Sequence, residues 1–279
     1  MKLLSFLTAF LLSFPNLRAS QQLSAPASSS SSQATTMPTT KPPQRDPQAL
    51  GVLNQVLATS GGVTAFTAIQ DFTASGTVTY FWAGEEVKGS VNLRGRGTDQ
   101  FRIDASLPHG IRSWAVSNGT GSIKEMDGTS QPISYYNATN LGSLTFPYFA
   151  IMAALQDSTT SVADLGLMQV DGRQVRQIHT RRQLDALNDT QAIFSELATR
   201  DYFIDPTTYQ LLKVEDMAHP AQSLTENYQH EISFSDYRLV GGVLVPFTIS
   251  ETIAGQQTWT IQLNQISFNT GLTDSDFQI

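Results

Sequence analysis

The sequence predicts a mainly β protein of the α+β kind, with one large, curved antiparallel sheet and helices on one side of it. Three observations support this fold class. Apolar and polar residues alternate with a period of two along much of the chain. Short turns carry hairpin dipeptides such as Asn118-Gly119 and Asp171-Gly172. Two stretches have helical spacing, and the body of residues 47–279 fits a single all-β domain.

The first 46 residues have the composition of a targeting segment followed by a tether. Lys2 precedes an apolar run from Leu3 to Phe14 that is too short to span a membrane, and the small residue Ala19 follows it. We expect residues 1–19 to be a secretory signal peptide, with an uncleaved N-terminal anchor as the alternative. Residues 20–46 are rich in Ser, Thr, Gln, Ala and Pro, which predicts a disordered tether.

Composition and charge exclude several classes of protein. The 279 residues include no cysteine, so disulfides, thiolate metal sites, thiol nucleophiles and a lipid-modified cysteine are excluded. The 24 Asp and Glu residues outnumber the 17 Lys and Arg residues, and the net charge of −7 argues against a nucleic-acid partner. We also expect no transmembrane segment after signal cleavage.

The body begins with a helix. Asp46 is placed to cap it, Pro47 takes the first helical position, Leu and Val residues recur at three- and four-residue spacing, and Gly61-Gly62 ends it. A second short helix is expected over Val63–Ile69.

The hydrophobic period then changes to two, which indicates strands. The first four expected strands are Phe72–Trp82, Val87–Arg94, Phe101–Leu107 and Ile111–Ser117. Further strands are expected at Leu167–Val170, Gln174–Thr180, Tyr202–Asp205, Gln210–Met217, Tyr228–Leu239, Val243–Ile253 and Thr258–Phe268. Ala192–Thr199 fits a helix and a strand equally. We therefore expect an antiparallel meander of about ten strands with one dry and one wet face.

The stretch Asn140–Gln156 has a different pattern. It is rich in Leu, Phe, Ile, Met and Ala, and Pro147 interrupts it. We expect one or two helices here, apolar nearly all round from Phe146 to Leu155. A helix of that kind must be covered by other parts of the protein.

Residue patterns of known catalytic and metal sites are missing from the sequence. There is no HExxH, GxSxG, SxxK, Walker or GxGxxG motif, and the four histidines lie in unrelated segments. We expect no cofactor and no bound metal, although a cluster formed in space from the histidines stays open. Arg94, Arg96, Arg102 and Arg112 lie on successive strands, either as a basic stripe for anionic headgroups or as a solvated face.

Apolar residues offer a further candidate site. The strand residues of the dry face and the oily helix would line either a packed core or a concave pocket for an acyl chain. The predicted pocket residues are Val78, Tyr80, Trp82, Val91, Leu93, Phe101, Ile103, Phe146, Phe149 and Met152.

Short motifs in the C-terminal part carry a family resemblance by their order. They are Phe203-Ile204-Asp205-Pro206, Tyr209–Lys213, Phe234–Arg238, Gly241–Pro246 and Ile266–Phe277. Together with the N-terminal helix that ends in Gly-Gly and the Thr-rich strands, they resemble the LolA/LolB-type periplasmic lipoprotein carriers and their outer-membrane lipoprotein-sorting relatives.

The resemblance implies an open, incomplete antiparallel β-barrel with helices that cover its concave face. It also implies an exported protein of the bacterial envelope, periplasmic or secreted, that holds lipid or lipoprotein acyl chains without being an enzyme. Two alternatives stay open: an RseB-type envelope sensor that binds a partner protein, and a secreted hydrolase with an unusual site.

Overall fold

The computed structural model describes residues 43–134, 137–138, 145–182, 198–219 and 226–279. The expected signal peptide, most of the expected tether, part of the apolar stretch that begins at Asn140, and most of Ala192–Thr199 lie outside the described residues. The findings below concern the described part of the chain.

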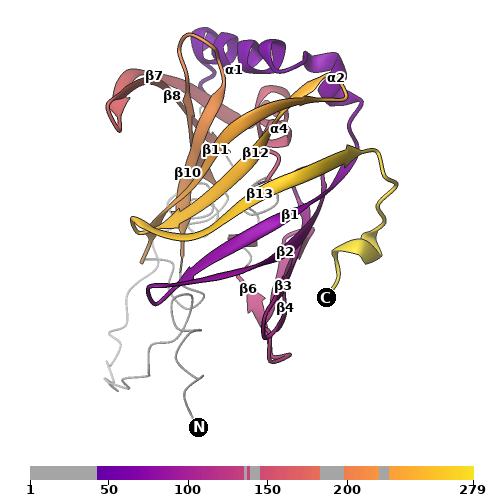
Figure 1. Ribbon diagram of the computed structural model, residues 1–279. Helices are drawn as coiled ribbons and strands as arrows, with labels where there is room; N and C mark the ends of the chain where they lie inside the picture. Colours follow the sequence, from indigo (N-terminus) through magenta and orange to yellow (C-terminus); the bar gives the residue numbers. More distant parts are fainter. Residues whose placement is uncertain (1–42, 135–136, 139–144, 183–197, 220–225) are drawn as a thin grey trace, which may run out of the picture.

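Thirteen strands of the described chain form one antiparallel sheet, which confirms the mainly β fold class (Figure 1). The strands are β1(Asp71–Trp82), β2(Glu85–Arg96), β3(Gln100–Leu107), β4(Gly110–Ser117), β5(Thr120–Lys124), β6(Ser130–Ile133), β7(Thr160–Val170), β8(Arg173–Arg182), β9(Thr199–Ile204), β10(Leu211–Ala218), β11(Tyr228–Val240), β12(Val243–Ile253) and β13(Gln256–Phe268). The sheet order is β6-β5-β4-β3-β2-β1-β13-β12-β11-β10-β9-β8-β7. Strands β6 and β7 are its edges, so the barrel is incomplete. The short strands β5 and β6 were not expected from the sequence pattern.

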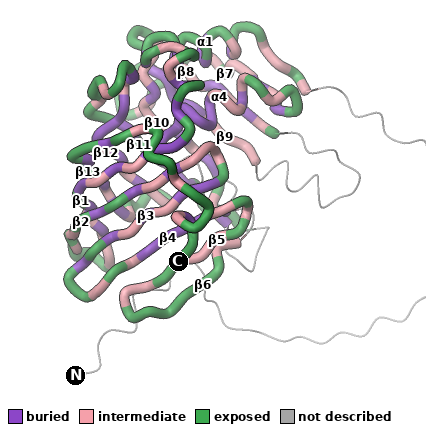
Figure 2. Tube along the Cα trace, turned by 90° about the vertical axis from the view of Figure 1, so that its right-hand side faces the viewer, coloured by how far each residue is buried: buried purple, intermediate pink, exposed green. Residues whose placement is uncertain are grey.

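More and less buried residues alternate along strands such as β1 and β3, as the period of two predicts (Figure 2). The pairing of β1 with β13 contains an irregularity. A register shift lies between Ser75 and Gly76, and a Cβ atom at Gly76 would lie 2.1 Å from the backbone oxygen of Gln262. Only glycine fits this close approach of two strands.

Three helices accompany the sheet in the described chain. They are α1(Pro47–Thr59), α2(Val63–Thr67) and α4(Tyr148–Gln156), and a short 3-10 helix, η2(Asp274–Phe277), follows β13. Helix α1 begins as the sequence predicts, because the carboxylate of Asp46 accepts a hydrogen bond of 2.9 Å from the backbone of Gln48. Figure 1 shows α1 across one end of the strands and α4 inside the curve of the sheet.

Residues that the sequence analysis assigns to the end of the tether are joined to the body. The backbone of Val162 in β7 donates to Gln44 and accepts from Asp46, at 2.9 and 2.8 Å, so Arg45 forms a short parallel bridge with the edge strand. Ordered contacts with the sheet therefore begin before α1.

Candidate functional site

The ten residues predicted to line a pocket come together on the concave face. Eight of them are buried, whereas Trp82 and Met152 are half-buried, and all ten belong to one apolar cluster or pack against it. The strand residues come from β1, β2 and β3, and Phe146, Phe149 and Met152 come from α4 or the residues just before it. The period of two and the apolar helix therefore place these side chains in one apolar cluster, and their role in binding a ligand stays a prediction.

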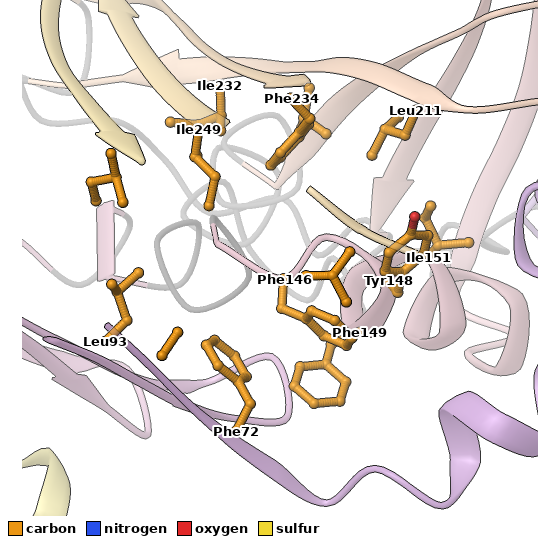
Figure 3. Packing of buried hydrophobic residues seen from close by; sticks show 14 of the residues in the cluster. Phe72, Leu93, Phe146, Tyr148, Phe149, Ile151, Leu211, Ile232, Phe234 and Ile249 are labelled. Carbon is orange, nitrogen blue, oxygen red and sulfur yellow. The ribbon is translucent and has the colours of Figure 1, made fainter. Parts of the chain in front are cut away.

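Phe146 occupies the centre of this cluster. Its ring lies 4.9 to 6.2 Å, centroid to centroid, from the rings of Phe66, Phe72, Tyr148, Phe149 and Phe268. Figure 3 shows Phe146 and Phe149 between Phe72 and Leu93 on one side and Ile232, Phe234 and Ile249 on the other. The segment that leads into α4 therefore fills the space between two walls of the half-barrel.

The second wall was not predicted as part of the site. It is formed by buried residues of β9 to β13, including Tyr202, Val214, Ile232, Phe234, Ile249, Trp259 and Ile261. Their alternation with polar residues was visible in the sequence, but the pairing of β1 with β13, which brings this wall opposite the first, was not.

Little open space remains under α4. One cavity of about 10 Å³ lies between the helix and the second wall, and it is lined by Pro147, Ala150, Arg200, Tyr202, Val214, Ile232 and Phe234. This volume suits about one water molecule, whereas pockets for small molecules measure about 300 to 1,000 Å³. The concave face of the described chain is therefore closed by its own side chains.

Helix α4 is held at its C-terminal end by Arg45. The guanidinium donates hydrogen bonds of 2.6 to 3.0 Å to the backbone oxygens of Ala154, Leu155, Asp157 and Thr160. The last carbonyls of a helix have no partner within the helix, and a cation is favourable there. Arg45 therefore fastens the end of the helix that covers the concave face.

A partly buried ion pair lies at the other end of the concave face. The guanidinium of Arg112 in β4 donates to both carboxylate oxygens of Glu125 at 2.9 and 3.2 Å. It also lies over the rings of Tyr80, Trp82 and Trp114, at 4.8 to 5.9 Å from their centroids. The hypothesis that Arg112 shares a basic stripe with three other arginines is therefore wrong.

Arg112 lies on the concave face because side chains alternate between the two faces of a strand. Arg112 and Trp114 are two residues apart in β4 and so share a face, and Trp114 is buried.

A second buried charged group lies on β10, β11 and β12. His230 contacts Asp216 through Nδ1 at 2.5 Å and Glu251 through Nε2 at 3.2 Å, and Nε of Arg200 lies 3.9 Å from Asp216. Burial alone lowers the pKa of His230, but the charge of Asp216 and the hydrogen bonds to both carboxylates outweigh burial and raise this pKa to about 10. A cationic imidazole with a carboxylate on each nitrogen has no free position for general base catalysis.

We call these six residues, Arg112, Glu125, Arg200, Asp216, His230 and Glu251, the polar end of the concave face. Tyr80 lies between its two parts. Burial raises the pKa of the Tyr80 hydroxyl, the charge of Arg112 lowers it and the charge of Glu251 raises it. The indole N–H groups of Trp114 and Trp259 are buried and have no hydrogen-bond partner among the described residues.

The other three arginines of the expected stripe lie on the convex face and are paired. Asp104 accepts hydrogen bonds from Arg94 at 2.8 Å and from Arg102 at 2.9 Å, while Arg96 binds Asp274 of η2. Burial raises the pKa of Asp104, but hydrogen bonds from Arg102 and Ser113 and the charge of Arg102 outweigh it and lower this pKa. These cations are neutralised within the protein.

The described residues contain neither a metal-binding group nor a membrane-spanning helix. No group of three or more His, Asp or Glu residues is placed to hold a metal ion. No helix in the same residues is long and apolar enough to cross a membrane.

Comparison with solved structures identifies the fold. A domain described as an outer membrane lipoprotein-sorting protein domain from Vibrio parahaemolyticus matches 83% of this chain and 96% of its own, with a TM-score of 0.52 and 14% identity. The chain has the LolA fold.

Two other structures with this LolA-type architecture match similarly. A LolA superfamily protein from Nitrosomonas europaea covers 83% of this chain and 97% of its own, with a TM-score of 0.50 and 10% identity. A DUF1329 family protein from Desulfovibrio piger covers 82% and 97%, with a TM-score of 0.50 and 12% identity. No protein-family profile and no curated protein sequence matches the chain. The likeness is therefore one of LolA fold, at low sequence identity.

Proposed function

We propose that this protein binds the acyl chain of a lipid or lipoprotein on its concave face and carries out no covalent chemistry. The observation that carries the proposal is the way the hollow is filled. Two apolar walls of one open sheet face each other, and Phe146 and the nine-residue, mostly apolar helix α4 separate them. Displacing this cover would expose a continuous apolar face.

The energies of the exchange support binding. An acyl chain gains about 0.8 kcal/mol for each methylene it buries, so about ten methylenes supply roughly 8 kcal/mol toward the costs of association and of moving α4 aside. Moving α4 aside costs apolar contacts, which the acyl chain replaces with contacts of the same kind. The small cavity between α4 and the second wall marks the place where the packing is already incomplete.

The three tryptophans of the chain provide a direct test. Trp82, Trp114 and Trp259 all belong to the concave side, so energy transfer from tryptophan to the neutral dye phenylnaphthylamine reports binding there. We expect saturable binding at one site and displacement of the dye by monooleoylglycerol. Phe81→Ala, a substitution on the opposite side of β1 from Tyr80, should bind the dye as the wild type does.

The result that refutes the proposal is equally plain. Dye that neither saturates nor is displaced by an acyl lipid would mean that the concave face is only a packed core. The sensor and the hydrolase named above would then be the functions to test, with a partner protein or with a panel of esters and glycosides. We further propose an envelope location, periplasmic or secreted, supported by the signal-like N-terminus and by the LolA fold.

A further inference from the structure

We propose that the polar end selects the ligand by its head, and that the ligand is a lipid with an uncharged ester head and not a free fatty acid anion. This inference rests on the proposed function, because it concerns the same concave face. It depends on the charge balance of the polar end and on the unpaired indole N–H groups of Trp114 and Trp259.

The first argument is continuity between the two parts of the concave face. The cavity under α4 is lined by Ala150 of the helix and also by Arg200 of the polar end. A chain that enters between α4 and the second wall therefore has its head beside the charged residues.

The second argument is that every charge of the polar end already has an opposite charge next to it. Arg112 is paired with Glu125, and Asp216 and Glu251 flank the cationic His230, with Arg200 beside Asp216. These side chains are largely buried; those of Asp216 and His230 expose only 2% and 7% of their surface. A ligand carboxylate placed here would lose its hydration without gaining an unpaired cation, and this loss is costly.

The third argument comes from the unpaired indole groups. The N–H groups of Trp114 and Trp259 are buried, the two residues being 7% and 2% exposed, and neither group has an acceptor among the described residues. A buried donor without a partner is unfavourable. A neutral acceptor such as an ester carbonyl that reaches one of these donors pairs with it and adds no net charge, so an ester head fits the polar end better than an anion.

The experiment compares two lipids with the same acyl chain, monooleoylglycerol and sodium oleate, as competitors of phenylnaphthylamine on the full chain. The wild type should bind the ester at least tenfold more tightly than the anion, since tenfold corresponds to about one poorly compensated charge interaction. Equal affinity, or tighter binding of oleate, overturns the inference and leaves the proposed function standing. Binding of neither lipid overturns both.

Variants test the assignment to these residues. Glu125→Gln leaves Arg112 without its carboxylate, and oleate affinity should rise about tenfold with the ester unchanged. Glu85→Gln makes the same charge change at the exposed first residue of β2 and should alter neither affinity. Trp259→Phe should weaken binding of the ester severalfold and change binding of oleate little.

If Glu125→Gln does not fold, Arg112→Met tests the pair from the other side, and oleate should then bind still more weakly. Unchanged lipid ratios in whichever of the two variants folds refute the role of the polar end.

Discussion

Replacing Phe146 by alanine is the most direct test of the cover over the concave face. The side chain is 1% exposed and touches five aromatic rings, so truncation removes both its own burial and the contacts of its neighbours. Phe→Ala changes in well-packed cores cost about 3 to 5 kcal/mol. We expect a loss in the upper half of this range, because both walls and α4 limit how far the hole can collapse.

Urea unfolding followed by tryptophan fluorescence measures this loss. Phe81→Ala, at a half-buried position on the other face of β1, deletes the same ring and should lose less than about 1 kcal/mol. The hole in Phe146→Ala should also bind benzene, as engineered apolar cavities do, and benzene should restore part of the stability by mass action. A loss below about 1 kcal/mol, or no stabilisation by benzene, would refute the description of Phe146 as the plug between the walls.

Three further predictions concern stability. His230→Gln should lower the free energy of unfolding by a few kcal/mol at neutral pH. Because the folded pKa of His230 is raised to about 10, the extra stability of the wild type is complete below the unfolded pKa near 6.5. It should disappear in urea titrations as the pH rises through 10. Asp71→Asn should lower the free energy of unfolding by about 2 kcal/mol. Burial raises the pKa of Asp71, but hydrogen bonds from residues 270–272 outweigh burial and lower this pKa. The extra stability of the wild type should therefore be present above pH 3.8 and fade in acid unfolding curves as the pH falls through the folded pKa. Arg45→Ala should lower the free energy of unfolding by about 1 to 3 kcal/mol and speed hydrogen exchange in α4 but not in β1. Exchange in α4 at the wild-type rate would contradict the proposal that Arg45 holds the end of that helix.

Local signals explain most of what the sequence predicted. Asp46 and Pro47 mark the start of α1 through neighbouring atoms alone, and hairpin dipeptides such as Asp171-Gly172 fix β7 against β8. The period of two assigns each strand residue to a face without knowledge of its partner. Such features need no information about distant parts of the chain, and they gave the fold class and the first apolar wall.

Features that depend on the pairing of strands far apart in the chain could not be predicted from local sequence patterns. The second wall faces the first because β1 pairs with β13, nearly two hundred residues later. The short strand β6 contains Pro132, which reads as a turn residue and is tolerated because β6 is an edge.

The spacing of charged residues from buried apolar ones also predicts which face they share. His230 is two residues from Ile232, and Glu251 is two from Ile249, so these charges had to share the buried face. The same parity places Arg112 beside Trp114.

A packed core and a lipid pocket made from the same apolar residues differ in whether charged groups are expected on their inner face. A core closed for stability alone needs no charges on its inner face, since apolar residues of similar volume are often as stable as buried ion pairs. Here one end of the concave face is apolar, and the other carries six charged residues and two unpaired indole donors. In our proposal, an acyl chain replaces the contacts of α4 at the first end, and an ester oxygen accepts a hydrogen bond at the second. This pair of ends, one for the chain and one for the head, is the reason we propose a binding site in the closed hollow.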